Sequence, residues 1–310
     1  MSEVKNRVEA EEPSGVLVIN KHQGVTSHDI VNRVRRLYGT RRVGHTGTLD
    51  PLATGALVVL VGRAAKAAEY LVSDSKRYIA TLRLGLTTDS EDITGTVLTE
   101  SGDIPAAEDV IRTCEQFCGD IMQVPPMYSA LKVDGQKLVD LARQGKTVER
   151  QARPVTIHAL RCTSTETPSD YILDVSCSSG TYIRTLCADI GAALGCGGVM
   201  ATLQRQETGG FSLAESYTLA QLEEMSEAER FSVLAPIESL FVTLPAVTLP
   251  AFYERLSRGG CEIYQKKIKT DFSVGTRVRI YDEKGGFYAL GEVRDYQDGS
   301  AIKAIKLFVL

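Results

Sequence analysis

The sequence predicts an α+β protein with two domains, and three observations support this prediction. The chain has 310 residues, a length typical of roughly two domains. Strand-like and helix-like segments follow each other without the regular order of repeated β–α–β units. From about residue 245 onward, short alternating segments separated by glycine turns replace the mixed pattern, as expected for a small β-barrel.

The composition is that of an ordinary globular protein. Hydrophobic residues make up 43% of the chain and charged residues 24%, which excludes disordered, collagen-like and disulfide-dense proteins. The seven cysteines contain no C-x-x-C pair, so reduced thiols are expected. Residues 1–15 lack the apolar core of a signal peptide, and no apolar run is long enough to span a bilayer. These features predict a cytoplasmic protein.

The net charge of −4 conceals two basic stretches. Residues 31–45 contain five arginines and no acid, and residues 131–154 contain six basic against three acidic side chains. Such stretches are suited to binding a polyanion, although arginine-rich helix faces are often simply solvated. Residues 86–110 carry seven acidic and no basic side chains, and we expect a solvated loop or edge there.

The first elements are predicted from apolar runs and capping residues. Thr26 and Asp29 form a capping box, and apolar residues on one face predict a helix from there through Tyr38, ended by Gly39. Three further elements are expected nearby: strands at Val16–Asn20 and Ala56–Val61, and a helix at Arg63–Val72.

The later elements follow from periodicity. Period-two alternation predicts a strand at Tyr78–Leu84, a further strand is expected at Tyr171–Cys177, and helices are expected at Ile111–Met122 and from Ile183 to Leu194. Near the C-terminus the predicted strands are Arg277–Tyr281, Phe287–Val293 and Ala301–Val309, with turns at Gly285-Gly286 and Asp298-Gly299.

The loop Gly44–Gly55, with the sequence G-H-T-G-T-L-D-P-L-A-T-G, is the segment best suited to chemistry. Its three glycines permit unusual backbone angles and close approach of another molecule. Asp50 precedes a proline, which holds it in an extended or capping conformation, so its carboxylate is a candidate nucleophile or base. A helix N-cap followed by a first-turn proline explains the same two residues without any function.

Other catalytic motifs are missing from the sequence. It has no Walker A pattern, no H-E-x-x-H and no G-x-G-x-x-G after a strand. Ser129–Lys132 matches S-x-x-K but lacks the companion motifs of acyl-transfer enzymes. The four histidines have no ligand-like spacing, so neither a metal nor another cofactor is predicted.

The Gly44–Gly55 loop closely resembles the signature of the TruB-type tRNA pseudouridine synthases, G-H-T-G-x-L-D-P-x-A-x-G. Further matches follow in the family's order along almost the whole chain: Gly15–Ser27, Lys76-Arg77-Tyr78, Pro125–Gly145, Ser179–Arg184 and Ala201–Arg205. The resemblance implies a catalytic domain with a mixed, largely antiparallel sheet over residues 1–245. It implies a PUA-like RNA-binding barrel over residues 246–310.

The resemblance also implies an activity and a set of site residues. The family isomerises uridine 55 in the TΨC loop of tRNA: the base is flipped out, its glycosidic bond is broken and it is rejoined through carbon. Asp50 matches the catalytic aspartate, Tyr78 the tyrosine that stacks on the base, and Arg184 the arginine that pairs with the aspartate. His45, Tyr182 and Leu203 match contacts to the flipped nucleotide or its neighbours, and Lys21 matches a lysine that supports the site.

The segment from about Val124 to Arg153 matches a mobile RNA-gripping insertion, which would explain the second basic stretch. His22 stands where the first motif usually has proline, and Val139 where the insertion usually has tyrosine. These departures concern loop rigidity and RNA grip rather than catalysis. The implied partner is the T-arm stem-loop of tRNA; no membrane or protein partner is implied, and a monomer is expected.

Two alternatives remain open. The first is a tRNA-binding or folding protein with vestigial catalysis, and the second is a guide-RNA-dependent pseudouridine synthase. The intact set of Asp50, Tyr78 and Arg184 argues against the first, and the long insertion argues against the second. A guanidinium paired with Asp50 would keep the carboxylate ionised, which predicts a nucleophile or base rather than an acid. Attack on the sugar, attack on the base and proton abstraction from the sugar all remain open.

Overall fold

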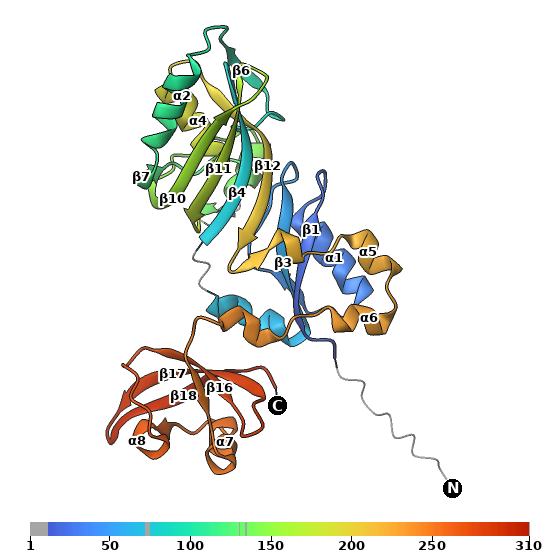
Figure 1. Ribbon diagram of the computed structural model, residues 1–310, viewed down its shortest axis with the longest axis vertical. Helices are drawn as coiled ribbons and strands as arrows, with labels where there is room; N and C mark the ends of the chain where they lie inside the picture. The colour runs from blue at the N-terminus through green and yellow to red at the C-terminus, as the bar shows by residue number, and fades with distance from the viewer. Residues whose placement is uncertain (1–11, 72–74, 130, 134, 310) are drawn as a thin grey trace.

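The computed structural model describes residues 12–71, 75–129, 131–133 and 135–309. They form an α+β fold in which a large mixed sheet is joined to a smaller C-terminal sheet (Figure 1). The predicted fold class is therefore confirmed. Within the described ranges, no helix combines the length and the apolarity that crossing a membrane requires.

Nine strands form the large sheet, and its main path runs in the order β1-β3-β12-β4-β11-β10-β7. Neighbouring strands on this path are antiparallel apart from β3 and β12, which are parallel. The nine strands are β1 (Gly15–Lys21), β2 (Val43–His45), β3 (Thr54–Val61), β4 (Ser75–Leu84), β7 (Gly119–Gln123), β10 (Arg153–Ser164), β11 (Asp170–Ser178), β12 (Gly198–Thr208) and β13 (Phe211–Ser212).

The parallel contact between β3 and β12 fixes the end of the Gly44–Gly55 loop. It consists of two residue pairs, of which Gly55 opposite Arg205 is one. Gly55 has a φ of +100°, and a Cβ at this position would lie 2.3 Å from the carbonyl oxygen of Arg205. Only glycine fits both requirements. The loop therefore ends against β12, in the middle of the sheet.

Helices cover the sheet in two groups (Figure 1). In one group, α4 (Ile183–Ala193) packs on β12 and β4, and α2 (Ala107–Glu115) packs on β10. The other group, α1 (Ser27–Leu37), α5 (Leu219–Glu224) and α6 (Glu227–Ser232), lies beside β1 and β3. Apolar side chains from both groups join one buried cluster, including Ile30 on α1 and Leu186 on α4.

The predicted capping box of α1 is complete. The Thr26 hydroxyl accepts from the backbone N–H of Asp29, and the Asp29 carboxylate accepts from the backbone N–H of Thr26 at 2.9 Å. This places the first turn of α1, and with it Ser27 and His28, at the edge of the cavity described below.

The predicted helix at Ile111–Met122 is wrong over its second half. Helix α2 ends at Glu115, and Gly119–Gln123 forms β7, which pairs with β10 at the edge of the large sheet. Gly119 has a φ of +100°, which helps the chain to leave the helix and turn into the strand. The partner strand follows only after the insertion, so local spacing could not reveal this pairing.

The segment predicted as a helix at Arg63–Val72 forms a tighter 3₁₀ helix, η1 (Gly62–Tyr70), and Val72 lies outside the described residues. Ala64 packs against the cluster under β1 and β3. Ala67 packs against Phe241 and residues of the C-terminal sheet. The helix η1 therefore lies between the two sheets.

The acidic segment is partly buried, contrary to the prediction of a solvated loop. Strands β5 (Leu86–Thr88) and β6 (Val97–Glu100) form a small arm, but Ser90 and Asp92 in the turn between them are buried. The Asp92 carboxylate accepts hydrogen bonds from Ser90 and from Thr94, at 2.9 and 2.6 Å. These internal bonds replace water around the buried carboxylate, and a count of charges cannot reveal them.

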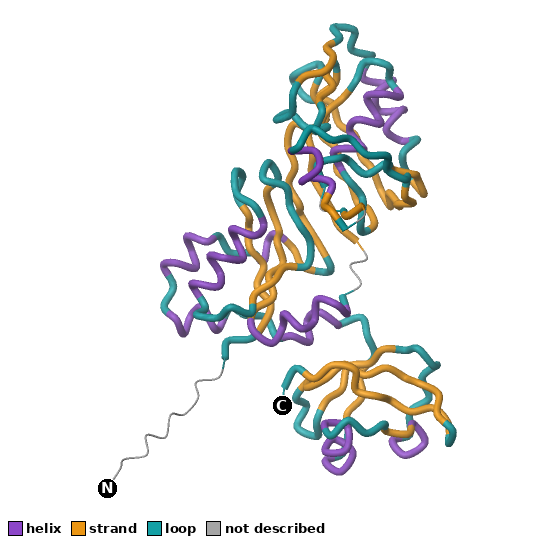
Figure 2. The backbone as a smooth tube through the Cα atoms, turned by 180° about the vertical axis from the view of Figure 1, so that it is seen from behind, coloured by secondary structure: helices purple, strands orange, loops and turns teal. Residues whose placement is uncertain are grey.

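The C-terminal sheet has five strands in the order β14-β16-β17-β18-β15 and curls into a half-barrel (Figure 2). It has its own apolar core, separate from that of the large sheet. Its elements are β14 (Ala246–Thr248), α7 (Ala251–Arg258), β15 (Ile263–Tyr264), α8 (Gln265–Ile268), β16 (Arg277–Tyr281), β17 (Phe287–Tyr296) and β18 (Gly299–Leu307). All three strands predicted for this part are confirmed.

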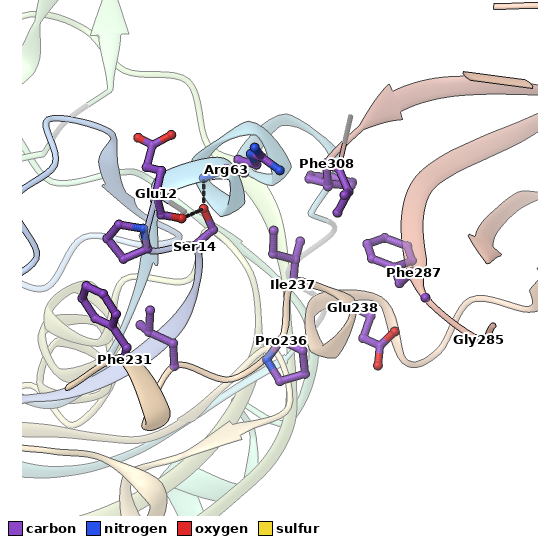
Figure 3. Close-up of a pocket in the computed structure, with 14 residues that line it drawn as sticks. Glu12, Ser14, Arg63, Phe231, Pro236, Ile237, Glu238, Gly285, Phe287 and Phe308 are labelled. Atoms are coloured by element: carbon purple, nitrogen blue, oxygen red, sulfur yellow. Dashed lines mark hydrogen bonds between the residues drawn. The ribbon is translucent and has the colours of Figure 1, made fainter. Parts of the chain in front are cut away.

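Aromatic side chains join the two sheets. Phe241, at the end of η3 (Ile237–Phe241), packs against Phe287 and Phe308 with ring centroids 6.4 and 5.9 Å apart. A cavity of about 570 Å³ opens beside this contact (Figure 3). None of the site residues predicted from the sequence lines it.

The remaining elements are short. They are β8 (Lys132–Val133), β9 (Gln136–Lys137), α3 (Leu138–Arg143) and η2 (Leu213–Glu215). The first three lie in the insertion and pack around a small apolar cluster of their own, centred on Leu138 and Leu141. The insertion therefore carries its own local core.

Candidate active site

A second cavity, of about 650 Å³, opens where the Gly44–Gly55 loop, β4, the start of α4 and the insertion meet. Six of the predicted site residues line it: His45, Asp50, Tyr78, Tyr182, Arg184 and Leu203. Lys21 does not line the cavity but lies beneath the loop. The tertiary structure thus brings together six residues that are up to 158 positions apart in the sequence, from His45 to Leu203.

Asp50 and Arg184 form an ion pair at the cavity wall. The Nε atom of Arg184 lies 3.0 Å from Oδ2 of Asp50, and the exposed side-chain fractions are 5% for Arg184 and 36% for Asp50. The other two guanidinium nitrogens donate to the carbonyl oxygens of Ser90 and Tyr128, at 3.1 and 2.8 Å. A nearly buried cation is therefore held on three sides, while the carboxylate remains accessible from the cavity.

Ser27 holds the loop immediately before Asp50. Its hydroxyl accepts from the backbone N–H of Leu49 at 2.8 Å and donates to the carbonyl oxygen of the same residue at 3.1 Å. After Asp50 the loop closes on itself, because the N–H of Ala53 donates to the Asp50 carbonyl at 3.1 Å. The carboxylate therefore projects from a stiff turn, as the Asp-Pro sequence predicts. Ser27 is the last residue of Gly15–Ser27, one of the segments that match the family, but the sequence did not predict its contact with Leu49.

Lys21 supports the loop from below. Its side chain is fully buried, and its ammonium donates to the carbonyl oxygens of Ala53 and His22, at 2.5 and 3.1 Å. Burial lowers the pKa of Lys21 from 10.5 to about 8, although the Asp50 charge opposes this shift. The Lys21 ammonium therefore loses its proton at a pH close to the upper end of the physiological range.

We expect the stability advantage of the wild type over Lys21→Met to grow as the pH rises from about 8 to about 10. In this window the unfolded chain binds more protons at Lys21 than the folded protein does. The contribution of Lys21 to the free energy of unfolding therefore increases with pH. Urea unfolding of both proteins at several pH values measures this difference. Lys66→Met, which removes an exposed lysine, serves as the control. A constant difference across the window would contradict a lowered pKa.

Tyr78 and Leu203 form an apolar wall of the cavity. Tyr78 on β4 is 6% exposed and Leu203 on β12 is 8% exposed, and both belong to the main core cluster. Burial raises the pKa of Tyr78, so its phenol is neutral at ordinary pH. An aromatic ring fixed in this way can serve as a stacking platform for a planar base.

Tyr182 is held at the start of α4 by Gln123, which is the last residue of β7. The backbone N–H of Tyr182 donates to the Gln123 side chain at 3.0 Å, and the Gln123 amide donates to the Tyr182 carbonyl at 3.2 Å. Gln123 is buried, and the sequence analysis did not single it out, because the segment before it was predicted as a helix through Met122. These two hydrogen bonds fix the backbone of Tyr182, which lies two residues before Arg184 in the sequence.

His45 lies at the end of β2, on the cavity wall. Burial and the charge of Arg205 lower the pKa of His45, which favours a neutral imidazole at neutral pH. Its Nδ1 atom is buried and has no hydrogen-bond partner among the described residues. The ring therefore has an unused polar atom close to the cavity.

The insertion forms part of the cavity wall. Tyr128, Ser129, Val139 and Arg143 all line the cavity. The carbonyl oxygen of Tyr128 accepts from Arg184, so the base of the insertion contacts the ion pair directly. The motif that begins at Pro125 predicted this segment, but not its contact with the arginine. In the described part of the chain, no group of three His, Cys, Asp or Glu side chains is arranged to hold a metal ion.

Two protein-family models match the sequence. One, described as "TruB family pseudouridylate synthase (N terminal domain)", matches residues 35–183. The other, described as "tRNA pseudouridylate synthase B C-terminal domain", matches residues 184–242. Together they span the loop, both partners of the ion pair and the insertion.

Curated relatives of the chain have the name tRNA pseudouridine synthase B. A tRNA pseudouridine synthase B from Francisella tularensis subsp. novicida is 42% identical over 291 residues, which are 93% of this chain and 93% of that protein. The tRNA pseudouridine synthase B from Clostridium kluyveri is 41% identical over 296 residues, covering 95% and 99% of the two chains.

Solved structures share the fold. A chain in the crystal structure of a Cbf5–Nop10–Gar1 complex superposes with a TM-score of 0.72 at 25% identity, covering 95% of this chain and 85% of that one. A chain of an archaeal box H/ACA Nop10–Cbf5 complex superposes with a TM-score of 0.69 at 23% identity, covering 98% and 89%. The second likeness concerns the fold alone.

Proposed function

The chain belongs to the TruB family of pseudouridylate synthases, and from this membership we propose that it converts uridine 55 in the TΨC loop of tRNA to pseudouridine. Pseudouridine synthesis in tRNA is the activity that the relatives' names support. Position 55, the T-arm stem-loop as the recognised element and a monomeric enzyme are our proposals beyond that activity.

The observation that carries this proposal is the Asp50–Arg184 ion pair at the wall of a cavity of about 650 Å³. A cavity of this volume accommodates one nucleotide. Its wall offers a neutral aromatic ring, and the cost of extruding a base, a few kcal/mol, can be recovered by stacking worth about 1–3 kcal/mol. The accessible carboxylate lies on the same wall.

The chemistry requires only a redistribution of bonds within one nucleotide. The bond between N1 of uracil and C1′ of ribose breaks, the base turns, and a bond between C5 and C1′ forms. The hydrogen on C5 leaves as a proton and N1 takes up a proton, so the product has the same composition as the substrate. We assign Asp50 as the nucleophile or base of this reaction and Arg184 as the cation that pairs with its carboxylate and fixes its position.

The other predicted residues take supporting roles in this proposal. Tyr78 stacks on the flipped base, and Lys21 supports the loop from below. His45, Tyr182 and Leu203 contact the nucleotide or its neighbours. We propose residues 1–245 as the catalytic domain, with the RNA-gripping insertion at about 124–153. Residues 246–310 form the PUA-like RNA-binding domain.

Tritium release from a tRNA transcript labelled at C5 of uridine tests the proposed function. Formation of the C5–C1′ bond expels the label, so the pure protein with a bare transcript is expected to release one equivalent. A transcript with cytidine at position 55 is expected to release none from that position. Release from the bare transcript by the pure protein would also exclude dependence on a guide RNA. Tight binding without any release would instead favour a tRNA-binding or folding protein.

A further inference from the structure

Lys76 lines the active-site cavity and has no acidic partner among the described residues. It lies on β4, two residues before Tyr78, and the one hydrogen bond of its side chain within the described residues is to the Ser179 hydroxyl, at 3.4 Å. No carboxylate of the described chain lies within ion-pair distance of its ammonium. Burial and the nearby Arg205 charge lower the pKa of Lys76, which is the behaviour of a cation lacking a counter-ion.

Arg205 places a second cation directly behind this position. Its side chain is 1% exposed, with Nε donating to the Ala56 carbonyl at 2.7 Å and Nη2 to the Gly47 carbonyl at 3.1 Å. Its Nη1 atom is buried and has no hydrogen-bond partner among the described residues. The two hydrogen bonds of this buried guanidinium go to backbone carbonyl oxygens, which carry no charge that would neutralise it.

Gly47 leaves a space between the two cations. A Cβ on Gly47 would lie 3.6 Å from Nη1 of Arg205 and 3.9 Å from Nζ of Lys76. Gly47 is not among the glycines with positive φ, so its backbone conformation does not require glycine. What distinguishes this position is the absence of a side chain where two positive groups converge beside the cavity. Such an arrangement is suited to an anion.

We propose that Lys76, with Arg205 behind it and Gly47 leaving room, binds a phosphodiester group of the substrate RNA adjacent to the flipped uridine. The ammonium of Lys76 makes the direct contact, because it reaches the cavity, and Arg205 adds attraction from the interior. This inference rests on the proposed function, which supplies an RNA substrate. The phosphodiester is the group on either the 5′ or the 3′ side of the flipped nucleotide.

Binding of modified stem-loop RNAs to variants of the protein tests the proposal. The probes are T-arm stem-loops with an uncharged methylphosphonate linkage on the 5′ side of the target uridine, on its 3′ side, or at neither. Each dissociation constant is measured in an Asp50→Asn background, so that turnover does not interfere. We expect Lys76→Met and one of the two neutral linkages each to weaken binding about tenfold. Combined, they should weaken it no further than either change alone.

Arg77→Met is the matched control. Arg77 is the next residue on the same strand, but it is exposed and forms a bidentate pair with Asp174 at 2.9 and 2.8 Å. Its removal should leave the effect of each neutral linkage unchanged. Lys76→Met should also reduce the slope of log Kd against log salt by about 0.7–0.9, the value for one phosphate contact, whereas Arg77→Met should not.

Gly47→Ala provides a second variant, because its added methyl group occupies the space between the cations without straining the backbone. It should weaken binding of the unmodified RNA and remove the effect of the sensitive linkage. Full, additive effects of both neutral linkages in Lys76→Met and Gly47→Ala would overturn the proposal. Failure of tritium release together with an intact linkage effect would refute the proposed function but leave the phosphate site standing.

Discussion

Asp50→Asn is expected to reduce tritium release by at least about 10³-fold, while RNA binding changes by no more than a few-fold. Removing a nucleophile or base removes a reaction step, and contributions of about 10²–10⁴ are typical of proton transfer alone. Asparagine has nearly the same shape, and the contacts that hold the loop use the backbone of Leu49 and Asp50 rather than the carboxylate. Single-turnover kinetics and a filter-binding assay measure the two quantities separately.

Asp174→Asn is the matched control for this experiment. Asp174 is also a partly exposed aspartate paired with an arginine, but it lies on β11 and does not line the cavity. Its substitution should leave the rate of release near that of the wild type. Substantial release by Asp50→Asn would show that the carboxylate is not essential and would contradict its assignment.

Arg184→Met is expected to lower the single-turnover rate by about 10²–10³-fold, the range typical of losing one fixed electrostatic partner. The substitution removes the ion pair to Asp50 and leaves the carbonyl oxygens of Ser90 and Tyr128 without their donor. The protein should also be destabilised. Because Asp50 is 36% exposed, water can replace part of the lost interaction, and the destabilisation stays below the 3–5 kcal/mol typical of fully buried pairs.

Arg184→Lys separates charge from geometry. Lysine keeps the positive charge, but its single ammonium cannot reproduce three nitrogen donors that lie in one plane and point to three different partners. An intermediate rate is therefore expected for this variant, with a thermal midpoint above that of Arg184→Met. If Arg184→Met folded with an unchanged midpoint and a rate within a few-fold of the wild type, the ion pair would have no role in the reaction.

Local sequence signals predicted the elements whose determinants lie within one turn of chain. The capping box of Thr26 and Asp29 is complete, and the spacing of Ile183 and Ile190 matches α4. The prediction failed at β7, because this strand exists only through its pairing with β10. The prediction for the acidic segment was wrong for a similar reason. Asp92 is buried, its carboxylate accepts hydrogen bonds from Ser90 and Thr94, and its backbone forms a β-bridge with Met200, about 110 positions away.

The candidate site shows the same division. The sequence alone determined which residues to expect, because several ordered motifs resemble one family and place Asp50, Tyr78 and Arg184 within them. Gln123 had no local signal of a role at the site, and Arg205 ended a matched motif without an assigned role, since each acts through a backbone contact with a distant segment.

The sequence by itself therefore determined the family, the fold class and the loop that carries the candidate carboxylate, because each depends on residue types at short spacing. Only the tertiary structure decided that Arg184 reaches Asp50, that the insertion contacts Arg184 through Tyr128, and that Lys76 and Arg205 converge over Gly47. The physical reason is that these contacts join the Gly44–Gly55 loop and the insertion to β4, β12 and α4. The sheet order that brings these elements together is set by pairing and burial across the whole chain.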